Sequence, residues 1–123
     1  MIEFAAAHIV GTGGAIGAVL RQYVSTRIES ETFPLGTFTV NVLGSFALGM
    51  LMFLGANNDL VLLLGTGVCG SFTTFSSFSV ATVRLWGTGE RGRAVVNALG
   101  SFVGAGFAIG LAWVLAQLIR TWA

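Results

Sequence analysis

A stretch in the middle of the chain combines residue types that could bind an ion without a charged side chain. It reads Gly70-Ser71-Phe72-Thr73-Thr74-Phe75-Ser76-Ser77-Phe78-Ser79, with six hydroxyl side chains and three phenylalanines spaced three apart. Hydroxyl groups donate hydrogen bonds, and the edge of a phenyl ring carries partial positive charge. A phenylalanine triad alone is typical of packing. Together with the hydroxyl groups, however, it could replace the hydration of a small anion, so this stretch is the candidate functional centre.

The stretch lies within an apolar segment, residues 60–85, and this position limits what can surround it. An unpaired backbone N–H or C=O in hydrocarbon costs several kcal/mol. Hydroxyl-rich or irregular backbone at membrane depth therefore has to be enclosed by protein or by a polar cavity. We expect a second subunit to provide part of that cover.

The composition places the chain in a membrane. Hydrophobic residues make up 54% and charged residues 9%, whereas ordinary globular domains contain about 25% charged residues. A membrane-spanning helix needs about 20 apolar residues, and four segments qualify, at about residues 4–24, 36–54, 60–85 and 94–119. We predict an all-α membrane protein, one four-helix domain over residues 1–123. With six basic residues and a net charge of +1, no nucleic-acid partner is expected.

Polar residues inside the predicted spans fall on helix faces. Thr37, Asn41 and Ser45 recur every four residues in the second span, and Asn97 and Ser101 do so in the fourth. Either stripe could instead form hydrogen bonds between helices, which contribute about 0.6 kcal/mol each in membranes. The full amide of Asn41 favours a binding role over that alternative.

Ionisable groups are nearly absent from the predicted spans. The carboxylates lie at helix ends or in loops, and the serines of the central stretch have no base near them in the sequence. Nucleophilic catalysis needs such a base, so the chain is not expected to be an enzyme.

Arg21, at the end of the first span, suits an entrance charge that concentrates anions, although a snorkelling arginine is an equally ordinary interpretation.

The sequence resembles the Fluc (CrcB-type) fluoride channels of bacteria over essentially its whole length. The similarity is carried by residues 13–21 (GGAIGAVLR), 36–44 (GTFTVNVLG) and 67–78 (GVCGSFTTFSSF). It implies an antiparallel, dual-topology dimer with two pores, in which the third helix breaks near the membrane centre. It also implies a structural Na⁺ at the dimer interface, held by the backbone carbonyls of Gly70 and Thr73 from both subunits.

The resemblance also implies a set of pore residues: Asn41, Phe75, Phe78, Ser101, Thr74, Thr37 and Arg21. The two phenylalanines would present ring edges to fluoride, Asn41 would donate a hydrogen bond, and Arg21 would line the vestibule. The hydroxyl groups would form a track along the pore. Two positions depart from the family: Ser71 stands where many members have glycine, and Asn97 occupies a position that is not uniform.

The implied function is passive export of fluoride through the bacterial inner membrane, which protects the cell from fluoride toxicity. One alternative is a small dual-topology exporter of cationic drugs, which would need a carboxylate within a span. Another is a non-conducting assembly subunit of a heterodimeric channel. That would explain the 18 glycines as close helix packing but not the hydroxyl-rich stretch.

The arginines are distributed unevenly between the two predicted sides of the membrane. The side with the first and third connections carries Arg21, Arg27, Arg84, Arg91 and Arg93. The other side has only Arg120 and the α-amino group. Because basic residues favour the cytoplasm, we predict one preferred orientation with both termini outside. The expected partner is either a second copy of the chain, in an antiparallel homodimer, or an oppositely inserted paralogue, in a heterodimer.

Overall fold

The computed structural model describes residues 2–123, and the side chains from Phe4 onward. The regular elements in this range are all helices. Its elements are α1 (Ile2–Arg27), α2 (Leu35–Phe53), α3 (Asn58–Leu60), the π-helix η1 (Val61–Cys69), α4 (Gly70–Phe72), α5 (Phe75–Gly87) and α6 (Arg91–Trp122). α3, η1, α4 and α5 follow one another along a single span. The described residues thus form four helical segments long and apolar enough to cross a membrane. This confirms the predicted all-helical chain with four such segments.

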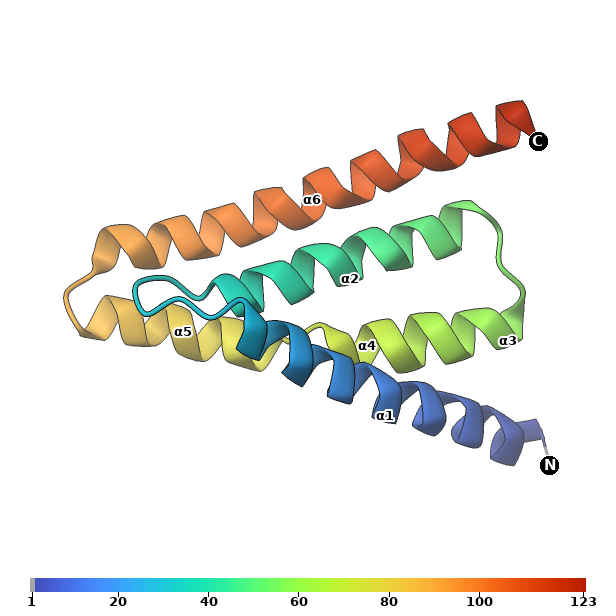
Figure 1. The fold of residues 1–123 in the computed structure, drawn as a ribbon, viewed down its shortest axis with the longest axis horizontal. Coiled ribbons are helices and arrows are strands. Elements are labelled where there is room, and N and C mark those ends of the chain that lie inside the picture. The colour runs from blue at the N-terminus through green and yellow to red at the C-terminus, as the bar shows by residue number, and fades with distance from the viewer. Residues whose placement is uncertain (1) are drawn as a thin grey trace.

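The four segments run up and down beside one another, so that the chain's two ends lie at the same end of the bundle (Figure 1). α2 packs against both α1 and α6, α5 packs against α6, and η1 packs against α1. The connections at residues 28–34 and 88–90 lie at the other end of the bundle, which we call the arginine-rich end. Arg27, Arg91 and Arg93 border these two connections.

Glycines allow α1 and η1 to approach backbone to backbone. A Cβ atom added at Gly67 would lie 2.8 Å from the Cα atom of Gly13, a separation that real Cβ atoms do not show. Small residues at such contacts are typical of membrane helices, because lipid gives apolar side chains no drive to associate. The sequence of η1 therefore fixes how closely the third span lies against the first.

The surface of the single chain is strongly apolar. Few large side chains are fully enclosed, with Val40 and Asn97 the largest among the described residues. By contrast, Phe75, Phe102 and Trp122 are 79%, 80% and 87% exposed. Exposure on this scale is unusual for a soluble monomer, and lipid or a second chain has to cover it. With its four apolar helices, the protein is a multi-pass membrane protein.

Candidate functional site

The third span changes conformation at Thr73 and Thr74. Their backbone angles are extended, with φ/ψ of −82°/159° and −148°/119°, and these two residues separate α4 from α5. Thr74 is the N-cap of α5, because its hydroxyl oxygen accepts a hydrogen bond from the backbone N–H of Ser77 at 3.2 Å. Threonine is among the residues that favour this position for that reason. The hydroxyl-rich composition noted in the sequence therefore has a local structural role.

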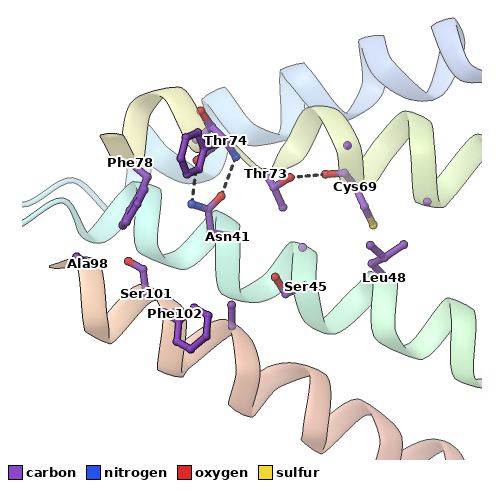
Figure 2. Close-up of a pocket in the computed structure, with 15 residues that line it drawn as sticks. Asn41, Ser45, Leu48, Cys69, Thr73, Thr74, Phe78, Ala98, Ser101 and Phe102 are labelled. Atoms are coloured by element: carbon purple, nitrogen blue, oxygen red, sulfur yellow. Dashed lines mark hydrogen bonds between the residues drawn. The ribbon is translucent and has the colours of Figure 1, made fainter. Parts of the chain in front are cut away.

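Asn41 of α2 braces the extended segment through both ends of its amide. Its Oδ1 accepts from the backbone N–H of Thr74 at 2.7 Å, and its Nδ2 donates to the Thr74 carbonyl at 2.9 Å. Figure 2 shows the Asn41 side chain reaching from its helix to Thr74, joined by these two bonds. One Nδ2 hydrogen of Asn41 is not used by this pair, since a primary amide carries two.

The interruption leaves the backbone carbonyls of residues 70–73 without their α-helical donors, and two of these donors have other partners. In a continuous α-helix, the N–H of Thr74 would donate to the Gly70 carbonyl and the N–H of Ser77 to the Thr73 carbonyl. Here the first N–H donates to Asn41 and the second to the Thr74 hydroxyl. The carbonyl oxygens of Gly70 and Thr73 therefore both lack their helical donors. Backbone carbonyls can replace the hydration of an alkali cation, so these residues fit the Na⁺ that the resemblance implies.

A cavity of about 390 Å³ opens beside the interruption, between α2, η1, α5 and α6. Its lining residues are Asn41, Gly44, Ser45, Leu48, Gly65, Cys69, Gly70, Thr73, Thr74, Phe75, Phe78, Ala98, Ser101, Phe102 and Ala105. Figure 2 shows Asn41, Thr74, Phe78 and Ser101 at one end of this cavity and Leu48 and Cys69 at the other. No side chain with a fixed charge lines it. An ion at this site would meet only hydroxyl, amide, ring and backbone groups.

Two further features of the lining matter for an anion. The rings of Phe75 and Phe78 lie with their centroids 5.9 Å apart and their planes tilted by 41°. The hydroxyl oxygen of Ser101 is buried and has no hydrogen-bond partner among the described residues. A buried hydroxyl without a partner is energetically unfavourable, and an anion in the cavity could accept its hydrogen.

The structure brings together five of the seven predicted pore residues. Asn41, Thr74, Phe75, Phe78 and Ser101 line the cavity, together with the predicted cation ligands Gly70 and Thr73.

Thr37 and Arg21 do not line the cavity. Thr37 is half-buried one turn before Asn41 on α2, and Arg21 lies in α1, where its carbonyl accepts from the Ser25 hydroxyl at 2.6 Å. Their proposed places in a longer path stay predictions.

Sequence reasoning missed a second polar connection, between α5 and α6. Asn97, only 1% exposed, donates from Nδ2 to the Thr82 hydroxyl at 2.8 Å, and that hydroxyl donates to the Phe78 carbonyl, also at 2.8 Å. Because the Thr82 hydroxyl gives its hydrogen to the Phe78 carbonyl, it can only accept a hydrogen bond from Asn97. The Asn97 amide must therefore point its Nδ2 toward Thr82. Its Oδ1 is left buried without a partner. The spacing of Asn97 and Ser101 marked this face of α6, but nothing in the sequence paired Asn97 with Thr82.

Comparison with known proteins identifies the family to which the chain belongs. The family described as "CrcB-like protein, Camphor Resistance (CrcB)" matches residues 8–114. The chain is 55% identical to the fluoride-specific ion channel FluC 2 of Haloarcula marismortui, over 97% of this chain and 100% of that protein. It is 50% identical to FluC 1 of Halobacterium salinarum, over 89% and 92%, and 42% identical to FluC of Rhizobium etli, over 91% and 92%. The predicted family, and with it the expectation that the chain is not an enzyme, is confirmed: this protein belongs to the CrcB-like family of ion channels.

Proposed function

We propose that the protein is a fluoride-selective channel through which fluoride leaves the cell passively. The observation that carries this proposal is the cavity lined by hydroxyl, amide and phenyl groups without a charged side chain. The relatives reported above are named as fluoride-specific ion channels. A passive path also agrees with the charges in residues 4–123, where the carboxylates lie at helix ends or in connections. Proton coupling and cationic drug export both use carboxylates within a span.

The contacts available to fluoride are individually weak, which suits conduction. Ser101 offers a free hydroxyl hydrogen, Asn41 its second amide hydrogen, and Phe75 and Phe78 their ring edges. A channel site has to bind well enough to replace water yet release the ion again. A fixed positive charge at this position would hold the anion more tightly. Thr37 and Arg21 would extend the path toward the arginine-rich end of the bundle.

The functional unit in this proposal is an antiparallel dimer, with the interruption of the third span near the membrane centre. Phe75 is largely exposed in the single chain, and the cavity beside it is only partly enclosed. On α6, a Cβ atom added at Gly106 or Gly110 would meet nothing within 4 Å. Glycines four residues apart on an open face are typical of helix association in membranes. A partner chain would also bring its own Gly70 and Thr73 carbonyls to complete the Na⁺ site.

The arginine asymmetry supports an oriented subunit within that dimer. Arg27 stacks on Tyr23 and Arg91 on Trp86, with 5.1 Å and 4.9 Å from guanidinium carbon to ring centroid. Both pairs border the arginine-rich end, and aromatic residues of this kind are enriched where membrane meets water. We infer that this end faces the cytoplasm, so that the partner is an oppositely inserted paralogue unless two copies of this chain insert in opposite orientations. Because two of the relatives above are archaeal, we place the channel in the cytoplasmic membrane of an archaeal or bacterial cell.

The physiological role follows from fluoride chemistry. Fluoride enters acidified cells as neutral HF, dissociates in the less acidic cytoplasm and is trapped there as an ion. A channel lets it leave down its gradient, so that no energy source is needed.

Growth of a bacterial strain that lacks its own fluoride channel tests this role. Expression of the chain, with its paralogue where one is required, should restore growth in fluoride and leave sensitivity to ethidium unchanged. Resistance to ethidium without resistance to fluoride would favour the drug exporter. If the chain conducts only when its paralogue is present, the assembly-subunit alternative is tested next by mutating Phe75 and Phe78 in this chain alone.

A further inference from the structure

Two side chains hold the conformation in which the two carbonyl oxygens suited to a cation lack helical donors. Within α-helical geometry each would accept a hydrogen bond from the N–H four residues later. The Asn41 amide removes the first of these donors by bonding to the N–H of Thr74. The Thr74 hydroxyl removes the second by bonding to the N–H of Ser77. The extended backbone of Thr73 and Thr74 leaves the carbonyls of residues 70–73 without helical donors, and the two side chains hold two of those donors in other hydrogen bonds.

We propose that Asn41 and Thr74 are positioning residues for a monovalent-cation site formed by the Gly70 and Thr73 carbonyls. This inference rests on the proposed channel only for the cation's place at the dimer interface. Asn41 holds the extended peptide from both sides, at 2.7 Å and 2.9 Å, although it lies 33 residues away in the sequence. Thr74 fixes the start of α5 from within the interruption. Both act through the backbone and neither contacts the cation.

The local energetics favour this role over simple packing. An extended pair of residues inside an apolar span leaves N–H and C=O groups without helical partners, and such groups are costly away from water. Asn41 satisfies both polar groups of Thr74, and the Thr74 hydroxyl satisfies the N–H of Ser77. These bonds hold the extended conformation in place, and that conformation leaves the carbonyls of Gly70 and Thr73 without helical donors. Backbone carbonyls without donors can replace the hydration of a cation.

The groups of the proposed cation site differ from those that would bind fluoride in the sign of the partial charge they present. Ser101 and the phenylalanine rings present positive edges or hydrogens, whereas Gly70 and Thr73 present carbonyl oxygens. A bound cation would offset that negative partial charge beside an anion path. The Asn41 amide lines the same cavity as both sets of groups, and its second Nδ2 hydrogen is outside the pair with Thr74.

Thermal unfolding of the purified full-length protein tests the inference without measuring flux. Samples in nanodiscs, with the paralogue present where one is required, are titrated with NaCl against N-methyl-D-glucamine chloride at constant ionic strength. The wild-type protein should become more stable as Na⁺ rises. Thr74→Val and Asn41→Leu should each require about tenfold more Na⁺ for the same stabilisation, the factor that about 1.4 kcal/mol represents.

A conservative variant separates positioning from loss of packing. Thr74→Ser keeps the capping hydroxyl, so it should retain the Na⁺ response. Thr39→Val is the matched control, because the Thr39 hydroxyl bonds only to the Leu35 carbonyl of its own helix and lies outside the cavity. Thr74 and Asn41 are substituted in separate proteins. If one variant fails to fold, the other still tests the inference.

The outcomes distinguish the inference from the proposed function. A wild-type Na⁺ response that persists unchanged in Thr74→Val and Asn41→Leu would overturn the positioning role while leaving the cation site in place. No Na⁺ response in the wild-type protein would overturn the site itself. Neither result depends on whether the protein conducts fluoride, which is measured separately.

Discussion

Replacing Asn97 with leucine should leave the protein as stable as before, or make it more stable, although Asn97 is one of the most buried polar side chains. Leucine has the same number of side-chain heavy atoms and the same branching. The change removes one hydrogen bond, from Nδ2 to Thr82, worth about 1 kcal/mol net. It also removes the unpartnered Oδ1, whose burial costs about 1–3 kcal/mol. Thr82 keeps its bond to the Phe78 carbonyl. The free energy of unfolding should therefore change by about 0 to +2 kcal/mol.

The same substitution at Asn41 should have the opposite sign, which makes the two variants a matched pair. Asn41→Leu leaves the N–H and C=O of Thr74 without partners. Each such group costs about 1–3 kcal/mol, for a loss of about 2–6 kcal/mol. Reversible unfolding in mixed detergent micelles, followed by tryptophan fluorescence, measures both variants. The reasoning is refuted if Asn97→Leu is destabilised by more than about 1 kcal/mol, or if Asn41→Leu is as stable as the wild type.

Three further predictions follow from single contacts. Phe75→Ile and Phe78→Ile should each sharply reduce fluoride flux in liposomes without changing assembly on size exclusion; wild-type flux in both would remove the rings from the mechanism. Gly13→Ala should destabilise the protein by about 1–3 kcal/mol through overpacking, because its Cβ would overlap the backbone carbonyl oxygen of Leu63 and lie 3.0 Å from the Cα of Gly67. Gly11→Ala, on the same helix with nothing within 4 Å, should be tolerated, and equal effects of the two would contradict the close approach of α1 and η1. C-terminal fusions should show active alkaline phosphatase and dark green fluorescent protein if both termini lie outside, whereas equal signals would argue for dual insertion.

The spans could be predicted from the sequence because twenty apolar residues with few charges have one common structural outcome in a membrane protein. Their ends could not. α6 extends from Arg91 to Trp122, beyond the predicted 94–119, because helical hydrogen bonding continues past the apolar window. The π-helical conformation of η1 also left no signal, since its leucines, valines and glycines suit an α-helix equally well.

Hydroxyl and aromatic residue types identified the candidate site, but not its hydrogen bonds. Ser45 belonged to a stripe seen in the sequence, and it lines the cavity with Asn41. The pairing of Asn41 with Thr74 and that of Asn97 with Thr82 join residues on different helices. Such pairs depend on how the helices rotate and pack, which residue spacing along one helix does not specify. The role of Asn41 toward the backbone therefore emerged only from the fold.

Fluoride efflux from liposomes that contain only this purified chain tests the central claim most directly. A fluoride electrode records the release, and the experiment is repeated with chloride and with empty liposomes. The account predicts rapid loss of fluoride and retention of chloride, provided that copies of the chain pair in opposite orientations. If the chain alone is silent, co-reconstitution with its paralogue should restore selective efflux. Chloride loss as fast as fluoride loss, or no fluoride loss from the well-folded chain with its paralogue, would contradict the fluoride channel.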